Sequence, residues 1–184
     1  MRPTDLDLTV DHQLRPAPMP GANRQLDLLR LDSPPDRFSI LGRFPAGFER
    51  TVPGGYAAAE EFLVLDGELE LEGRLLRRGD LTVVPAGYPR TEMRTEQGCL
   101  VLAWFGGLPD FRPHDELPPC DVPVTTVRVD ADGELPASPV ASWARGEVPA
   151  GDAPVEVITA DLTRWTRSGA PAPGAGDLVR RERA

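Results

Sequence analysis

The sequence predicts an all-β fold, an antiparallel β-barrel within a chain of 184 residues. The chain holds 21 Pro and 18 Gly, a composition that favours many short strands and turns over long helices. Apolar residues make up 40% of the chain and charged residues 27%, which is typical of a globular protein. A chain of this length supports one good hydrophobic core, so we expect one barrel with extensions.

Residues 1–23 are polar and interrupted by prolines, which predicts an N-terminal arm. Residues 1–20 carry three aspartates and no apolar run, so they predict neither a secretory signal nor a membrane span. A cytoplasmic location follows as the default expectation.

Short apolar runs separated by turn residues place the barrel over residues 24–108. Residues 60–66 are apolar on both faces, which predicts a central strand, with Glu60, Phe62 and Val64 on one face. Residues 68–72 alternate strictly between Glu and Leu, which predicts a strand with one solvent-exposed face. The other expected strands are residues 26–31, 37–44 and 81–84 and a closing hairpin of 90–95 with 99–105.

Prolines interrupt the chain beyond the barrel, and residues 109–168 are expected to form an irregular extension that packs on the barrel. We expect strands at residues 124–129 and 155–158 within this extension. A helical turn capped by Asp161 is expected over residues 161–167. Residues 169–184 are rich in Gly, Pro and Arg, which predicts a mobile tail.

Acidic residues exceed basic residues by 29 to 20, so the surface is expected to repel phosphate backbones and to bind no nucleic acid. Every basic residue is Arg. Of the two cysteines, Cys99 lies in an apolar run, where a free thiol behaves as a small hydrophobe, and we expect no disulfide with Cys120.

Two segments carry a family resemblance. Residues 60–67, EEFLVLDG, place a glutamate and a glycine around a six-residue spacer, and residues 79–87, GDLTVVPAG, read Gly, five residues, Pro, any residue, Gly. On these motifs the chain resembles the cupin superfamily, in particular the cupin domain of anti-sigma and small dioxygenase-like proteins. The resemblance covers residues 37–105 and implies a jelly-roll barrel; a degenerate second cupin repeat in the C-terminal extension stays open as an alternative.

The sequence departs from the family at its metal ligands. The family motif places His-any-His shortly before the glutamate and another His after the Pro-any-Gly turn. These positions hold Gly54 and Tyr56, or Pro53 and Gly55 with the longer spacer, and Arg90. Only Glu60 remains, and a guanidinium does not deprotonate to bind a metal, so we expect no metal and no other cofactor. The two histidines, His12 and His114, lie in loop-like sequence without ligand spacing.

The remaining polar residues at these positions predict a metal-independent site. We expect Arg90 to receive an anionic or carbonyl-bearing ligand, with Glu60 or Tyr56 as general acid or base. The alternative is that Glu60 and Arg90 form a buried ion pair that fills the space without chemistry. The other expected ligand-binding residues are Glu92, with Arg94 as a further candidate, and an apolar wall of Phe62, Val64, Leu81, Val83, Leu102 and Trp104.

Three classes of function follow. The resemblance permits a metal-independent isomerase, cyclase or lyase that acts on a small polar or anionic molecule, and the Lys-free composition is associated with bacteria of high GC content and with secondary metabolism. The second class is a noncatalytic ligand-binding or accessory barrel, and the third is a metal-dependent dioxygenase-like cupin with atypical ligands. An open pocket at Glu60 and Arg90 would favour the enzyme. We also expect a homodimer, formed when the N-terminal arm adds to a sheet edge of a second copy.

Overall fold

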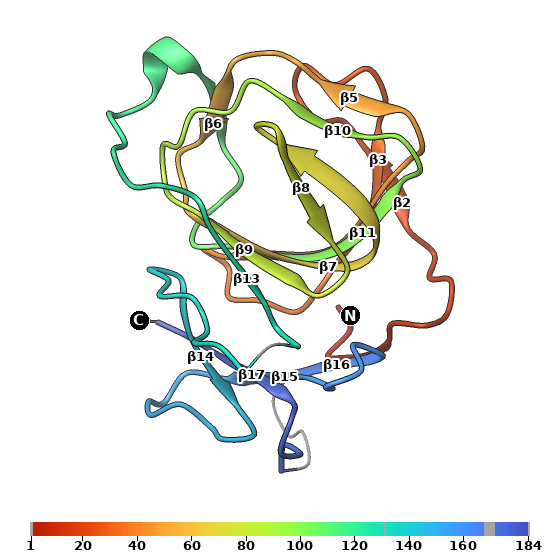
Figure 1. Cartoon of the computed structure of the whole chain (residues 1–184), viewed down its shortest axis with the longest axis vertical. Coiled ribbons are helices and arrows are strands. Elements are labelled where there is room, and N and C mark those ends of the chain that lie inside the picture. The colour runs from red at the N-terminus through yellow and green to blue at the C-terminus, as the bar shows by residue number, and fades with distance from the viewer. Residues whose placement is uncertain (1, 131, 168–171, 184) are drawn as a thin grey trace.

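The structure is a computed structural model that describes residues 2–130, 132–167 and 172–183. Within these residues the regular elements are β-strands and one short 3-10 helix, which confirms the predicted all-β fold. The strands form two layers, a large sheet that curls into a barrel and a smaller sheet beneath it (Figure 1). No helix in the described ranges is long and apolar enough to cross a bilayer.

The barrel is built from ten of the described strands, paired antiparallel. These are β2 (Arg15–Ala17), β3 (Leu26–Arg30), β4 (Phe38–Phe44), β5 (Phe48–Arg50), β7 (Glu60–Leu71), β8 (Arg74–Arg77), β9 (Asp80–Val84), β10 (Met93–Thr95), β11 (Cys99–Phe105) and β13 (Thr125–Arg128). Strand β7 is central, because its first half pairs with β9 and β11 and its second half with β8 and β10.

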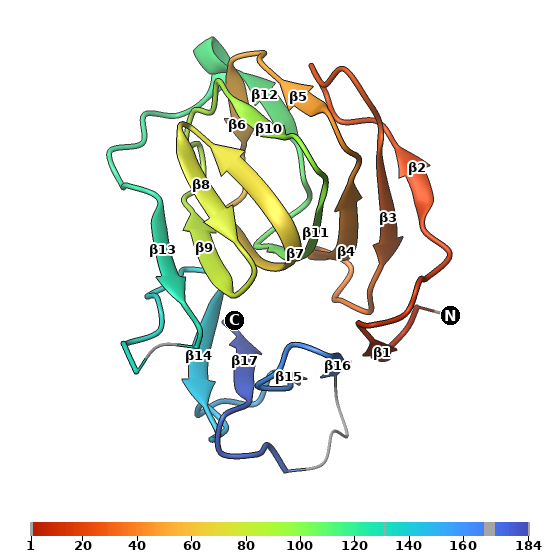
Figure 2. The ribbon, with the colours of Figure 1, turned by 45° about the vertical axis from the view of Figure 1, so that its right-hand side comes forward.

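A short ribbon covers one end of the barrel (Figure 2). It consists of β6 (Gly54–Tyr56) paired with β12 (Phe111–Pro113), and the 3-10 helix η1 (His114–Glu116) follows. Gly54 and Gly55 allow this close pairing, since a Cβ atom at Gly54 would lie 2.4 Å from the carbonyl oxygen of Arg112.

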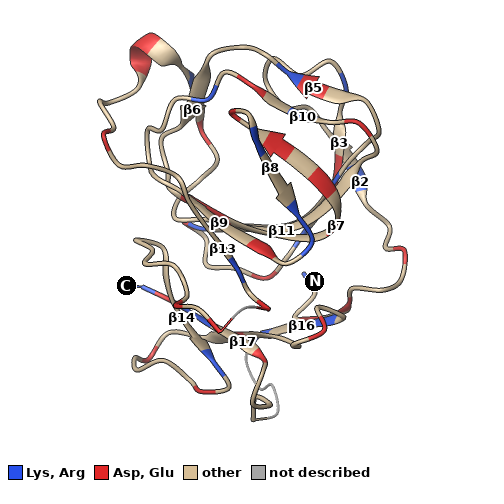
Figure 3. Cartoon of the chain, viewed as in Figure 1, with Lys and Arg blue, Asp and Glu red and all other residues tan. Residues whose placement is uncertain are grey.

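The smaller sheet joins both ends of the chain. Its strands, in spatial order, are β1 (Asp5–Asp7), β16 (Arg164–Arg167), β15 (Val155–Ile158), β17 (Leu178–Glu182) and β14 (Ala141–Arg145). Acidic and basic residues lie along both layers (Figure 3).

The side chains of β7 alternate between two cores. Phe62 and Val64 face the barrel interior, where they pack with residues such as Tyr56 and Phe105; we call this the interior cluster. Leu63 and Leu65 face the other way and pack between the layers with Trp104 and Trp165; we call this the interlayer cluster. Both faces of the first half of β7 are therefore buried, as the sequence of residues 60–66 predicted, whereas the second half has exposed residues such as Glu68.

Three local expectations were wrong. Strand β10 does not form a hairpin with β11, because it pairs with β5 and β7 on the far side of the barrel. The expected helical turn holds strand β16, in which Trp165 and Arg167 are buried in alternation, and Asp161 accepts hydrogen bonds from Thr163 instead of capping a helix. Of the tail expected to be mobile, residues 178–182 form strand β17 between β14 and β15, while residues 168–171 and 184 lie outside the described residues.

The N-terminal arm pairs within its own chain, β1 with β16 and β2 with β3. The expectation that this arm is unpaired, and so adds to a sheet edge of a second copy, is therefore wrong. The homodimer itself stays a prediction.

Both cysteines are free thiols, and they differ in burial. Burial raises the pKa of Cys99 to about 12, so its thiol stays protonated and unreactive at neutral pH. Cys120 is partly exposed. We expect a thiol reagent such as DTNB to label one cysteine per chain in the native protein and two in urea. Rapid native labelling of both, or continued labelling in Cys120→Ser, would contradict the burial of Cys99.

Candidate functional site

The candidate site lies inside the barrel, where the ribbon strand β6 meets β7 and the loop before β10. The backbones of Gly54 and Arg90 bond each other in both directions, with N–O distances of 3.1 and 2.7 Å. This bridge brings Arg90 beside Tyr56 and Glu60, so the three residues selected at the motif positions lie together.

Glu60 and Arg90 form a buried ion pair. Arg90 Nη2 donates a hydrogen bond to Glu60 Oε2 at 2.5 Å. Arg90 is 2% exposed and Glu60 7%, so little water screens the pair. The guanidinium carbon of Arg90 also lies 4.9 Å from the centroid of the Tyr56 ring, within range of a cation–π interaction.

Tyr56 is held in its neutral form. Burial is the main cause that raises the pKa of Tyr56 to about 12, and the nearby Glu60 carboxylate adds to it. At neutral pH its hydroxyl can therefore donate a proton or a hydrogen bond and is a poor base.

A cavity of about 50 Å³ lies next to the ion pair. Tyr56, Glu60 and Phe62 line it, together with apolar side chains of β4 and β11. Ordinary ligand pockets measure roughly 300–1,000 Å³, so this space suits a few water molecules or a very small ligand.

Four of the expected wall residues point away from this cavity. In the antiparallel register Val84 lies opposite Glu60, and Val83 opposite Glu61, so Leu81 and Val83 face outward. Strand β11 repeats the pattern, with Phe105 opposite Glu60 and Trp104 opposite Glu61. Leu81, Leu102 and Trp104 consequently pack in the interlayer cluster, whereas Phe62 and Val64 lie in the interior cluster. The interior residues that we missed, such as Ala103 and Phe105, follow from counting this register.

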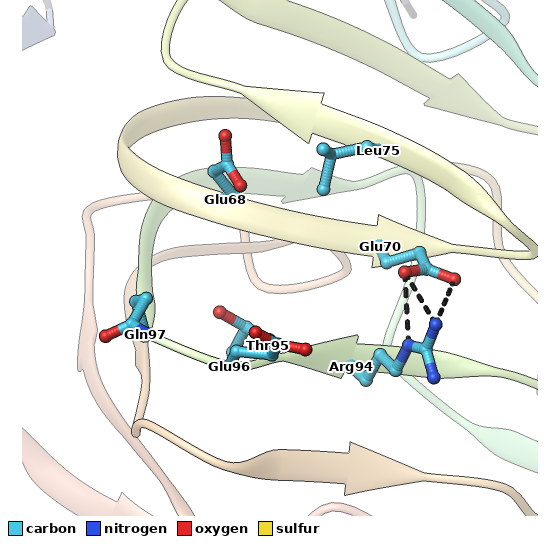
Figure 4. A pocket seen from close by; sticks show the side chains of 7 residues that line it. All are labelled: Glu68, Glu70, Leu75, Arg94, Thr95, Glu96 and Gln97. Carbon is cyan, nitrogen blue, oxygen red and sulfur yellow. Dashed lines mark hydrogen bonds and ion pairs between the residues drawn. The ribbon is translucent and has the colours of Figure 1, made fainter.

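Glu92 and Arg94 lie on the outside of the barrel and are exposed. Arg94 makes hydrogen bonds of 3.0–3.1 Å with Glu70, and both side chains line a separate surface hollow of about 230 Å³ (Figure 4). Strand β10 pairs with the second half of β7, far along that strand from Glu60, so neither the Glu92 nor the Arg94 side chain reaches Glu60.

Arg50 and Phe111 also lie at this site, and neither was among the residues expected from the sequence. Arg50 is fully buried, its Nε donates to the carbonyl oxygen of Pro20 at 2.9 Å, and its guanidinium carbon lies 4.0 Å from the centroid of the Phe111 ring. Phe111 in turn meets Tyr56 edge to face, with ring centroids 5.7 Å apart. Alternation along β5 could have indicated that Arg50 is buried, because Arg50 lies on the same face of the strand as the buried Phe48.

The side chains at this site do not fit the metal ion that the resemblance implies. Glycine has no side-chain atom that could bind a metal. A guanidinium has only N–H groups, which donate hydrogen bonds and offer no lone pair. The single carboxylate, Glu60, already binds Arg90. In the described part of the chain no three His, Cys, Asp or Glu side chains gather into a group that could hold a metal. The backbone opposes a ligand at Gly54 as well, since strand β12 occupies the space of any side chain there.

Neither a family model nor a curated protein sequence matches this chain. Solved structures do match. A proposed dioxygenase of Nostoc punctiforme PCC 73102 is 16% identical, with a TM-score of 0.63 over 97% of this chain and 77% of that one. A proposed glyoxylate-induced protein of Pseudomonas aeruginosa is 12% identical, with a TM-score of 0.53 over 91% and 84%. An acetylacetone dioxygenase of Acinetobacter johnsonii is 15% identical, with a TM-score of 0.46 over 52% and 69%.

Proposed function

We propose that this chain, which has the cupin fold, binds a small polar or anionic organic molecule inside its barrel and acts on it by acid–base chemistry without a metal. The buried Glu60–Arg90 pair beside a neutral Tyr56 carries the proposal. A proton acceptor, a proton donor and a cation meet there in a site with little water, which suits general acid–base catalysis.

Each side chain has one role in the proposed chemistry. Arg90 holds the anionic or carbonyl oxygen of the ligand, and the Glu60 carboxylate accepts a proton from the carbon next to a carbonyl group. Tyr56, neutral because of its raised pKa, donates a proton to the carbonyl oxygen, so an enol forms. When Glu60 returns its proton to a different carbon and Tyr56 recovers its own, the result is an isomerase. When the enol instead expels a leaving group from the neighbouring carbon, that group takes the proton of Glu60 and the result is a lyase. When the enol carbon attacks a second carbonyl of the same molecule, the new alkoxide takes the proton of Glu60 and the result is a cyclase.

The second candidate is a noncatalytic barrel that binds a ligand or serves as an accessory protein. The small cavity and the direct contact between Glu60 and Arg90 favour it, because the pair itself fills part of the interior. The third class, a metal-dependent dioxygenase, is disfavoured by the donor set described above.

Proton exchange distinguishes the two candidates. We expect the protein to accelerate deuterium uptake from D2O at the carbon next to the carbonyl of pyruvate or 2-oxobutyrate, followed by NMR. Glu60→Gln should lose this acceleration, because a neutral amide accepts no proton, and Arg94→Gln should keep it, because Arg94 is exposed outside the barrel. Exchange no faster than in buffer would contradict catalysis on these acids and favour the noncatalytic barrel.

Metal analysis of the untagged protein completes the test. We expect far less than one equivalent of Fe, Mn, Ni or Zn, and no change in deuterium exchange after treatment with a chelator. A stoichiometric metal that Glu60→Gln releases would contradict metal independence.

Other expectations belong to this proposal. We propose a cytoplasmic location, which the two free cysteines support, since thiols persist in reducing compartments. We also propose a homodimer, checked by light scattering. The proposed division of the chain is an N-terminal arm, a barrel and a C-terminal extension that packs on the barrel, with a degenerate second cupin repeat in the extension as the open alternative.

A further inference from the structure

Two buried arginines, rather than one, stand at this end of the barrel. Arg50 is 1% exposed and Arg90 2%. Each uses one nitrogen, Arg50 Nε toward Pro20 and Arg90 Nη2 toward Glu60. Arg50 Nη1 and Nη2 and Arg90 Nε and Nη1 are buried without a hydrogen-bond partner among the residues that the structure describes.

Aromatic contacts connect the two guanidinium groups. Arg50 lies against the ring of Phe111, Arg90 lies against the ring of Tyr56, and the two rings meet edge to face. The charge of Arg90 also acts on Arg50: the pKa of Arg50 is lowered first by burial and then by the charge of Arg90.

The negative charge beside these groups does not balance them. Glu60 is the buried carboxylate at this place and already pairs with Arg90. Glu72 raises the pKa of Arg50 less than Tyr56 and Glu60 do. It is exposed and accepts hydrogen bonds from the backbone N–H groups of Thr91 and Glu92. Two guanidinium groups and one buried carboxylate leave one positive charge without a partner. A buried charge or N–H group without a partner raises the free energy of the folded state.

We infer that Arg50 and Arg90 together form the binding site for the carboxylate group of a compact carboxylic acid. A carboxylate is planar and accepts paired hydrogen bonds from guanidinium groups. Its single negative charge neutralises the excess charge, whereas a phosphate dianion would leave a negative charge in the interior. The small cavity next to Glu60 restricts the rest of the molecule to a few atoms.

This inference deepens the proposed function, because it names the substrate class and adds Arg50 as a binding residue. It depends on the proposed function only for the claim that the bound carboxylic acid is a substrate. Carboxylate binding itself is measured without turnover.

Thermal unfolding with simple probes tests the inference. At neutral pH and matched ionic strength, we expect saturating acetate to raise the Tm by about 2 °C or more, since a ligand of the native state stabilises it. Acetamide has nearly the same shape without the charge and should leave the Tm unchanged. Equal shifts with both probes, or a larger shift with phosphate than with acetate, would overturn the carboxylate assignment.

Variants of Arg50 provide a second test of the inference. Arg50→Gln should abolish the acetate-dependent shift, and the exposed Arg94→Gln should retain it. If Arg50→Gln does not fold, Arg50→Lys keeps the charge but loses the planar donor pair, and calorimetry should show acetate binding weakened about tenfold. Unchanged acetate binding in Arg50→Lys or Arg50→Gln would overturn the role of Arg50.

The two proposals fail in different ways. Acetate binding that depends on Arg50, together with no deuterium exchange above buffer, would support the binding site and reject catalysis. Exchange that depends on Glu60, together with equal acetate and acetamide shifts, would support catalysis and reject the two-arginine site.

Discussion

Glu156→Ala is expected to lower the free energy of unfolding by about 3–5 kcal/mol, the cost of leaving buried charges without their partner. Glu156 is 0% exposed, on strand β15 between the layers. Its Oε2 accepts the indole N–H groups of Trp104 and Trp165, each at 2.7 Å. Its Oε1 accepts Arg180 Nη1 at 2.7 Å and Arg167 Nη1 at 3.0 Å.

Removing Glu156 leaves two indole donors and two guanidinium groups with fewer acceptors in a buried region. Arg180 retains Glu61, whose Oε2 it contacts at 2.9 Å, so the network is weakened rather than abolished. Urea unfolding followed by tryptophan fluorescence measures the change. Glu68→Ala is the matched control, because Glu68 forms an exposed pair with Arg77 and should change stability by less than about 1 kcal/mol. Equal losses in the two variants would show that the buried network adds nothing.

Gly54→His is expected to destabilise the barrel by about 3 kcal/mol and to bind no metal, because overpacking forces the backbone to move. A Cβ atom at Gly54 would lie 2.3 Å from Cζ of Phe111 and 2.4 Å from the carbonyl oxygen of Arg112. Strand β12 would have to leave β6 before an imidazole could turn toward Glu60.

Gly133→His is the control, since a Cβ atom at Gly133 meets nothing within 4 Å and should change stability by less than about 0.5 kcal/mol. Urea unfolding and metal analysis are run on both variants. Stoichiometric zinc in Gly54→His with unchanged stability would show that β12 is not a barrier and that the metal site is lost by side-chain identity alone.

The local sequence carried the all-β class, the central strand β7 and the position of the candidate site. Alternation in residues 60–66 placed Phe62 and Val64 on the face of Glu60, because successive side chains of a strand point to opposite sides. The spacing from Glu60 back to Tyr56 and forward to Arg90 selected three residues that the fold brings together. These features depend on neighbours in the chain or on motif spacing, so they are readable from sequence.

Register between strands and pairing between distant segments depended on the folded chain. The outward direction of Val83 and Trp104 follows from which residue lies opposite Glu61, and strand pairing sets that across long intervals of sequence. Strand β1 pairs with β16, and the Glu156 network joins β7, β15 and β17, contacts that no local pattern marks. Arg50 reads as an ordinary surface arginine until β12 covers it with Phe111. Periodicity describes one strand at a time, whereas burial of a charge depends on every segment that packs around it.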